Sequence, residues 1–526
     1  MGHLVPKSEI PETPMAKSYQ EIGTEQFGPS FSSDGMVAQM TANIYKAMGL
    51  SNAYGSDEAF MEGFLNIQKA LATGSVTGFA DATALRLENL DDVMTSVLYS
   101  NEHLVLFNWL NRVVSKQPVY EYNVRKRYGD GRRTLGFQEG GTPRPSTGQW
   151  ERKTATVRFM GIRGGVTHQA SLTGALGGFQ ISPAEEEERG RTLDLLGIIE
   201  RWAIHGDKDL KALTSPEINY DGILRQLEDA VTNGIIDEIT AGSGGKGNVI
   251  DKQGQPLTFD DIEAGTLQTF EKGFLSSTRN QALFCNPNVS AGLSLQKLPS
   301  ERAVLGVDGT ASGRYVSGVP LGGFKTQRGV VPFRESIFME PVEFNDPLLD
   351  ASKVASTAPA APATITSGTS ADAGATWSGT FYYFVSALND GGESLATAVD
   401  GGSSVGVSAG EKVTLTISSV TDAQGYRVYR GTASNGSDAV YIGLSPAAVA
   451  TTFVDTNARI PGTTDALLLY NSQDSITIPQ MSPLVKLPLG VVSTTVEFLL
   501  LLYHTIVVKA PERIIWWKNV GNAIES

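Results

Sequence analysis

A change in composition at about residue 357, reversed at about residue 470, most constrains how this 526-residue chain can fold. Residues 356–368, STAPAAPATITSG, have the composition of a linker. The segment that follows contains short runs typical of strands, separated by turn residues: FYYFVSAL, KVTLTIS, YRVYRG, AVYIGL and TTFVDT. Such regular short strands predict an all-β sandwich at 357–470. Residues after about 470 resemble in pattern those before about 357. We therefore expect the sandwich to be inserted into a host domain, with few contacts between the two.

The composition of the whole chain is that of a soluble globular protein, with 41% hydrophobic and 19% charged residues. The formal net charge of −14 argues against nucleic-acid binding by bulk electrostatics. One cysteine excludes an intramolecular disulfide framework, and the five histidines lie too far apart for a metal-ligand pattern. The N-terminus lacks the apolar core of a signal peptide, and the apolar run 498–508 is too short to span a bilayer. We therefore expect a soluble, cytosolic protein without a membrane partner.

The clearest predicted helix spans residues 183–205. Ser182 and Glu185 form a capping box around Pro183, and four glutamates, residues 185–188, suit the positive end of the helix dipole. Apolar residues recur at helical spacing and predict the buried stripe: Leu193, Leu196, Ile199, Trp202 and Ile204. Gly206 can end this helix.

Residues 116–163 predict a strongly basic β-hairpin. The segment contains eleven basic and four acidic residues, a net charge of +7, so the rest of the chain carries −21. Such a hairpin could bind nucleic acid or an acidic surface on a neighbouring copy. The acidic remainder of the chain favours the second reading. The residues that we expect to contact a neighbouring subunit are Arg125, Lys126, Arg127, Arg132, Arg133, Arg152 and Lys153.

The rest of the sequence predicts further helices and strands around this helix and this hairpin, which together indicate an α+β fold. Residues 1–84 suggest an extended arm with some helix, and 85–98 and 104–114 suggest two helices. Residues 220–340 alternate helices with short strands. Among them, Ala282–Cys285 predicts a buried strand followed by a helix capped at Asn286. Residues 496–508 predict a closing strand.

No pattern in the sequence predicts catalysis, a cofactor or a metal. Gly242–Gly247 resembles a phosphate loop, but glycine replaces the required Ser or Thr at position 247. Glu185–Glu188 are explained by the helix dipole, His168 has no partner at a recognisable spacing, and Cys285 lies in an apolar strand. We therefore expect a protein that is not an enzyme.

The ordered set of elements resembles the major capsid protein of tailed bacteriophages. The stretches that carry the resemblance are LRLENLDDVM…EHLVLFNWL (85–110), VYEYNVRKRYGDG…FQEGGTPRP (119–145), ERKTATVRFMGIRGGVTH (151–168) and IIERWAIHGD (198–207). The resemblance covers roughly 85–350 and, more weakly, 471–526.

The resemblance implies the Hong Kong ninety-seven fold, divided between 85–356 and 471–526, after an N-terminal arm at 1–84. Residues 116–170 would be the extended loop over an adjacent subunit, 183–205 the spine helix of the peripheral domain, and 220–340 the axial domain. The insertion at 357–470 resembles immunoglobulin-like or fibronectin-like domains that some of these capsid proteins carry.

The function implied is structural: hexamers and pentamers that assemble in the host cytoplasm into an icosahedral virion shell, enclosing double-stranded DNA without binding it specifically. Scaffolding, portal and decoration or cement proteins are the implied partners. Three alternatives remain open at this point: a surface adhesin, a hydrolase with an accessory sandwich, and a nanocompartment shell protein.

Overall fold

The computed structural model describes residues 103–521, except 130–135, 143–144, 172–181, 211–218, 244–245, 272–274, 276–279, 297–321, 341–344, 373–374, 376, 447–450 and 490–493. The predicted arm at 1–84 and the predicted helix at 85–98 lie outside the described residues. Within them the fold is mixed α+β and rich in strands, which confirms the predicted fold class. No described helix is long and apolar enough to cross a membrane.

The long helix α6 spans Pro183–His205, the predicted range. The Ser182 side chain accepts a hydrogen bond from the Glu185 backbone N–H at 3.2 Å, and Gly206 follows the last turn. The buried face differs from the predicted stripe, because Leu193, Leu196 and Trp202 lie at its margin and are only half-buried. Its centre is formed by Leu195, Ile199, Glu200, Ala203 and Ile204.

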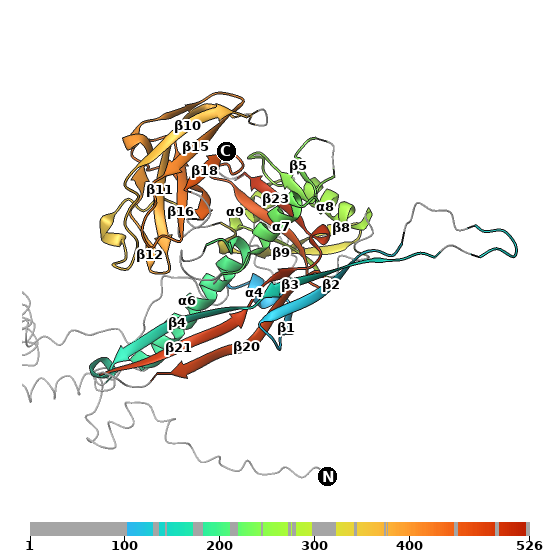
Figure 1. The fold of residues 1–526 in the computed structure, drawn as a ribbon, viewed down its shortest axis with the longest axis horizontal. Helices are drawn as coiled ribbons and strands as arrows, with labels where there is room; N and C mark the ends of the chain where they lie inside the picture. Colours follow the sequence, from blue (N-terminus) through green and yellow to red (C-terminus); the bar gives the residue numbers. More distant parts are fainter. Residues whose placement is uncertain are drawn as a thin grey trace, which may run out of the picture. The chain divides into compact units, whose positions relative to one another are not determined.

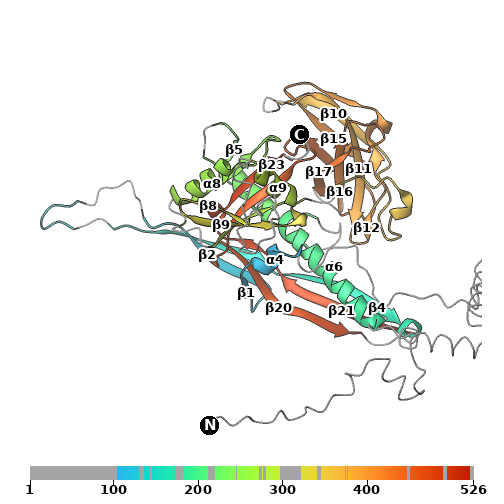
Figure 2. The same cartoon turned by 180° about the vertical axis from the view of Figure 1, so that it is seen from behind.

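Helix α6 packs on a five-stranded sheet (Figures 1 and 2). The strand order is β1 (Arg112–Val114), β20 (Ile476–Pro488), β21 (Thr495–His504) and β4 (Arg158–Thr167), with β22 (Val507–Val508) also paired to β20. Alternate residues of β21 point to the helix, namely Phe498, Leu500 and Leu502. This alternation is expected for a strand with one face on a core.

Two expectations for this sheet are wrong. The predicted helix at 104–114 is only the short α4 (Leu106–Trp109), because the chain becomes extended at Leu110 and then pairs with β20. The predicted strand at 496–508 is two strands, since the chain leaves the ladder at residues 505–506 and pairs again with the start of β20.

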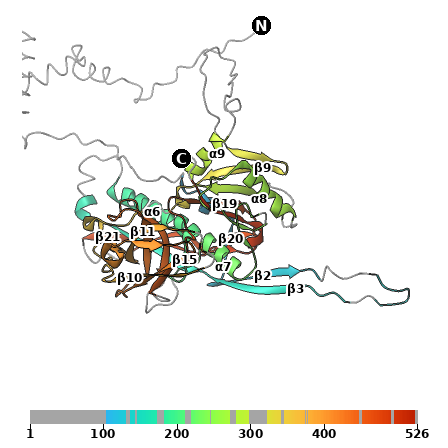
Figure 3. The ribbon, with the colours of Figure 1, turned by 90° about the horizontal axis from the view of Figure 1, so that it is seen from above.

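A second, seven-stranded sheet has helices on both faces (Figure 3). Its order is β5 (Glu238–Thr240), β6 (Val249–Asp251), β23 (Ile515–Val520), β19 (Thr464–Tyr470), β7 (Gln281–Cys285), β9 (Gly329–Glu335) and β8 (Gly323–Thr326). Its helices are α7 (Ile223–Thr232), α8 (Phe259–Glu271) and α9 (Pro287–Leu295).

Strand β7 lies inside this sheet, between β19 and β9, and is buried at every position. Ala282 and Phe284 face the core shared with α6 and α7, whereas Leu283 and Cys285 face the core with α8 and α9. Burial on both faces explains the continuous apolar run. The predicted strand and the helix start capped at Asn286 are both confirmed.

Residues 365–455 form two further sheets that enclose one hydrophobic cluster. The first is β10 (Ile365–Ala371), β15 (Glu411–Ile417) and β18 (Thr452–Asp455). The second is β12 (Gly392–Glu393), β11 (Gly379–Asn389), β16 (Gly425–Gly431) and β17 (Val440–Pro446), with β13 (Thr397–Ala398) and β14 (Val405–Val407) also on β11. We call these two sheets the sandwich, and the rest of 103–521, apart from residues 119–156, the body. The immunoglobulin-like assignment and the bounds 357–470 remain predictions.

We expect Trp202→Ala to lower the free energy of unfolding by about 2–3 kcal/mol, less than a fully buried tryptophan would. Its indole is half-buried, donates a hydrogen bond from Nε1 to the Tyr220 carbonyl at 3.0 Å, and lies against Gly206. Urea unfolding of the dissociated subunit measures the loss. Ile198→Ala on the exposed side of the helix is the control, and an equal loss in both variants would contradict the packing described for α6.

Candidate functional site

The predicted hairpin is present as β2 (Val119–Arg127) and β3 (Gln149–Thr156), which pair with each other and with no other described strand. Figure 1 shows them as a two-stranded ribbon that leaves the sheets of the body. The basic segment 116–163 is not one unit, however. Arg158 and Arg163 lie on β4, which pairs with β21 along its whole length, so they belong to the body.

Part of the hairpin's positive charge is neutralised within the hairpin itself. Lys126 Nζ lies 2.9 Å from Glu151 Oε2, and Arg152 forms an ion pair with Glu121 across the two strands. Both pairs are solvent-exposed, so their contribution to stability is about 0–1 kcal/mol each. These lysine and arginine side chains therefore remain free to exchange partners on contact with another surface.

The other predicted contact residues have fewer partners. Arg127 is exposed and Lys153 is partly exposed, and neither forms an ion pair in the part of the hairpin that the structure describes. Arg125 stacks its guanidinium over the Trp150 ring, 3.8 Å from the centroid. Arg132 and Arg133 lie outside the described residues.

Sequence analysis missed the exposed aromatic residues of the hairpin. Tyr128, Phe137 and Trp150 expose 86%, 60% and 59% of their surface. Aromatic side chains and arginine are the residue types that most often dominate binding energy at protein interfaces. The signal was available, because Tyr128 and Trp150 stand at the ends of the two strands, next to the turn.

A buried carboxylate joins α6 to the start of α4. Glu200 is fully buried, and its two oxygens accept hydrogen bonds from the backbone N–H groups of Leu106 and Phe107, at 2.6 and 2.8 Å. Burial raises the pKa of Glu200 to about 7, against the opposing effect of these hydrogen bonds. The carboxylate thus holds the first described residues of the chain against α6.

A second buried polar pair lies beside it. The Tyr220 hydroxyl is 3.0 Å from His504 Nε2, and the Phe107 ring meets the imidazole edge-on. Burial lowers the pKa of His504 to about 4 and, helped by Glu200, raises that of Tyr220. The imidazole is therefore neutral at pH 7. Both side chains are buried, and Tyr220 belongs to the core cluster around α6, so we assign the pair to the core.

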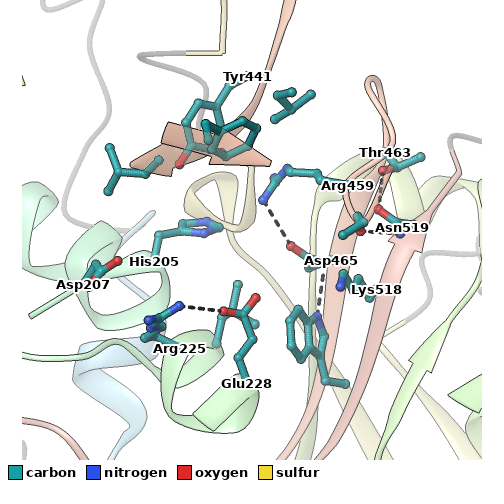
Figure 4. A pocket seen from close by; sticks show the side chains of 18 of the residues that line it. His205, Asp207, Arg225, Glu228, Tyr441, Arg459, Thr463, Asp465, Lys518 and Asn519 are labelled. Carbon is teal, nitrogen blue, oxygen red and sulfur yellow. Dashed lines mark hydrogen bonds and ion pairs between the residues drawn. The ribbon is translucent and has the colours of Figure 1, made fainter. Parts of the chain in front are cut away.

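A cavity of about 300 Å³ lies between the sandwich and the body (Figure 4). Loose ion pairs line it: Arg459 with Asp465 at 3.9 Å, and Arg225 with Glu228 at 3.5 Å. His205 Nε2 lies 3.2 Å from two backbone carbonyls, which only accept, so this nitrogen carries the proton. Burial lowers the pKa of His205 to about 3, which keeps the ring neutral. With cations and anions balanced, we assign the cavity to the contact between sandwich and body.

The sandwich contacts the body more closely than its linker-like ends predict. The Tyr441 N–H donates to the Asn345 carbonyl, and the Ala396 N–H to the Leu348 carbonyl, both at 2.8 Å. On the body side, Leu210 fills the space left by Gly425, where a Cβ atom would lie 2.4 Å from its Cδ2. A larger residue at this position would displace the Leu210 side chain, so the glycine suits the close approach.

The remaining sequence candidates do not converge on a site. His168 is exposed at the end of β4, and burial raises the pKa of the Cys285 thiol to about 12. Of the glutamates at the start of α6, Glu187 pairs with Arg191 and Glu188 with Lys486. No cluster of metal-ligating side chains occurs among the described residues.

Comparison with known proteins gives four relatives in sequence, of which two are described below, while no family model matches. The major capsid protein of Staphylococcus phage K is 22% identical over 476 residues, covering 84% of this chain and 90% of its own. The putative major capsid protein of Enterococcus phage phiEF24C is 24% identical over 490 residues, covering 87% of this chain and 95% of its own.

Solved structures with a similar fold have low TM-scores. They include the capsid of a native GTA particle, with a TM-score of 0.43, 9% identity and coverage of 85% of this chain and 99% of that one. The holo-SrpI encapsulin complex from Synechococcus elongatus PCC 7942 has a TM-score of 0.39 and 10% identity, with coverage of 85% and 96%. Scores this low do not separate capsid from encapsulin. The two sequence relatives are what confirms the resemblance to phage major capsid proteins.

Proposed function

We propose that this chain, a relative of the phage major capsid proteins, assembles as hexamers and pentamers into an icosahedral shell around double-stranded DNA. The match in sequence carries the proposal, because it spans 90–95% of the length of the capsid proteins concerned. It favours a structural role over a surface adhesin or a hydrolase. The same match supports the virion capsid as the place of action. Assembly in the host cytoplasm with scaffolding, portal and decoration or cement proteins is part of the proposal.

Within this function, we assign the hairpin to contacts between subunits. Among the described strands, its two strands pair only with each other, and it exposes aromatic and basic side chains together. The chain outside the basic segment carries a net charge of −21, so a second copy offers an acidic surface. Complementary charge would set the register of the contact, and the aromatic residues would supply burial. A shell that is acidic overall also avoids adhesion to the DNA that it encloses.

Electron microscopy of the concentrated protein, with and without the scaffolding protein of the source phage, tests the function. We expect closed particles with fivefold and sixfold capsomers. Protein that stays monomeric under both conditions would contradict a capsid role. Nuclease-protected double-stranded DNA in particles from infected cells would distinguish a virion from a nanocompartment.

Reversing the charge of basic residues on the hairpin should lower the yield of particles while leaving the stability of the folded subunit nearly unchanged. We expect Arg127→Glu to lower particle yield several-fold, and Arg132→Glu with Arg133→Glu to lower it about tenfold, while subunit unfolding changes by less than about 0.5 kcal/mol. Particle yield by sedimentation and urea unfolding of subunits measure the two effects separately.

The matched control is Lys325→Glu, an exposed charge reversal on β8, which belongs to the seven-stranded sheet of the body. Equal losses of particles in Arg127→Glu and Lys325→Glu would mean that total charge, rather than the hairpin, governs assembly.

A further inference from the structure

In the part of the chain that the structure describes, the hairpin has no backbone ladder with the body. Its last rung is formed by the Val157 N–H, which donates to the Pro118 carbonyl at 2.7 Å. Beyond that rung the chain continues directly into β4 on one side and returns toward β1 on the other. The direction in which the hairpin leaves the body therefore depends on this continuity with β4 and on side-chain contacts at its root.

One such contact is made by Lys509. Its backbone is fixed directly after β22, where its N–H donates to the Ser475 carbonyl at 2.7 Å. Its ammonium donates to the Gln473 carbonyl at 2.8 Å and to the Tyr120 hydroxyl at 3.1 Å. The same ammonium lies 5.3 Å from the ring centroid of Tyr120 and 5.9 Å from that of Tyr122.

The two tyrosines are well placed to receive a cation. They are alternate residues of β2, so they share one face of the hairpin, and their rings are nearly parallel with centroids 6.2 Å apart. Lys509 forms no ion pair with a carboxylate among the described residues. Its charge is therefore held chiefly by two oxygen acceptors, the Gln473 carbonyl and the Tyr120 hydroxyl, with the tyrosine rings at longer range, an arrangement with a defined direction.

The rest of the root is not packed solidly. A cavity of about 250 Å³ separates hairpin residues, including Tyr122 and Thr154, from body residues that include Asp221, Gln226 and Thr505. A close-packed interface would hold the hairpin without help from one side chain. This cavity gives the root room to move.

We propose that Lys509 is a positioning residue, which fixes the direction of the hairpin by holding Tyr120 and Tyr122 against the end of β22. The inference rests on the proposed function only in that the hairpin must reach a neighbouring subunit. Releasing Lys509 lets the root move into the adjacent cavity, and the outer hairpin then samples many directions. A subunit whose hairpin is no longer held by Lys509 therefore binds a neighbour less often in the productive orientation.

The test measures hairpin direction on dissociated full-length subunits. Spin labels at Glu139→Cys on the hairpin and Asp260→Cys on α8 report one distance, and the native Cys285 is fully buried and stays unlabelled. We expect a narrow distance distribution in the wild type, a broad one in Lys509→Met and a narrow one again in Lys509→Arg. Hydrogen exchange at the amides of β2 near Tyr120 should be about tenfold faster in Lys509→Met.

Lys486→Met is the matched control, because Lys486 also lies over an aromatic ring, that of Phe498, but on β20 of the body. Equal distributions for wild type and Lys509→Met, or a broad one for Lys509→Arg, would overturn the inference. Either result can occur in protein that forms particles normally. Failure of the wild type to form particles would instead contradict the proposed function and leave the distance result standing.

Discussion

Replacing Glu200 by leucine lowers the free energy of unfolding by about 3–5 kcal/mol, because two buried N–H donors lose their acceptor. Those donors belong to Leu106 and Phe107, and the described structure offers no other acceptor at that place. Urea unfolding of the dissociated subunit measures the loss. Glu200→Gln keeps one carbonyl oxygen and should lose less than half as much. Equal stability of the leucine variant and the wild type would contradict the role of Glu200 at the start of α4.

The same residue makes stability depend on pH. The pKa of Glu200 is raised from 4.5 in the unfolded chain to about 7, so the folded state holds a proton that the unfolded state has released. Its contribution is complete below pH 4.5 and is lost as the pH rises through 7, by about 3 kcal/mol in all. His504 acts in the opposite direction, because its pKa is lowered to about 4 and its contribution is lost on acidification from pH 6.5.

The difference between wild type and Glu200→Gln isolates the glutamate from the histidines. Relative to the variant, the wild type should lose stability steadily between pH 5 and pH 8. Unfolding in urea at four pH values across this interval gives the difference. A difference that does not vary with pH would show that Glu200 keeps an ordinary pKa in the folded protein.

Replacing Arg430 by methionine should destabilise the sandwich by about 3–5 kcal/mol, since it leaves a buried carboxylate without its cation. Arg430 Nη1 lies 2.7 Å from Asp455 Oδ2, both residues are more than 95% buried, and Tyr383 donates to the same oxygen. The guanidinium also lies against both the Trp377 and the Phe381 ring, 4.7 and 5.0 Å from their centroids.

Hydrogen exchange of the β11 and β16 amides, measured in the full chain, reports the lost stability of the sandwich. The amides of α6, which lies in the body, should keep their protection from exchange. Arg427→Met is the control, because the ion pair of Arg427 with Glu393 is less buried. Adding Asp455→Leu to Arg430→Met should recover part of the stability, because the unpaired charge is then removed. Protection that is unchanged in Arg430→Met would contradict this assignment.

Local signals in the sequence predicted the elements that depend on few neighbours. The bounds of α6 follow from Ser182 and Gly206, and β7 follows from a short apolar run that ends at a capping asparagine. Elements whose conformation depends on pairing with a strand far away in the sequence were predicted poorly. Residues after Leu110 are extended because β20 lies beside them, although their own pattern favours helix.

The functional surface was also predicted only in part. Charge within 116–163 is visible in the sequence, so the basic hairpin could be expected. The sequence could not show that Arg163 pairs with Glu497 on β21, or that Lys509 meets Tyr120, since these partners are more than three hundred residues apart. Glu200 was missed because a buried glutamate in a helix has the same spacing as a solvated one.

The position of β7 has a consequence for how the chain folds. Its two neighbours in the sheet are β9 and β19, and the whole sandwich lies between them in sequence. The central ladder of the body therefore closes only after the sandwich segment has left the ribosome. A sandwich that collapses first shortens the effective loop and lowers the entropy cost of bringing β19 to β7. A slow-folding sandwich would leave the apolar edge of β7 exposed, and subunits would then aggregate during synthesis.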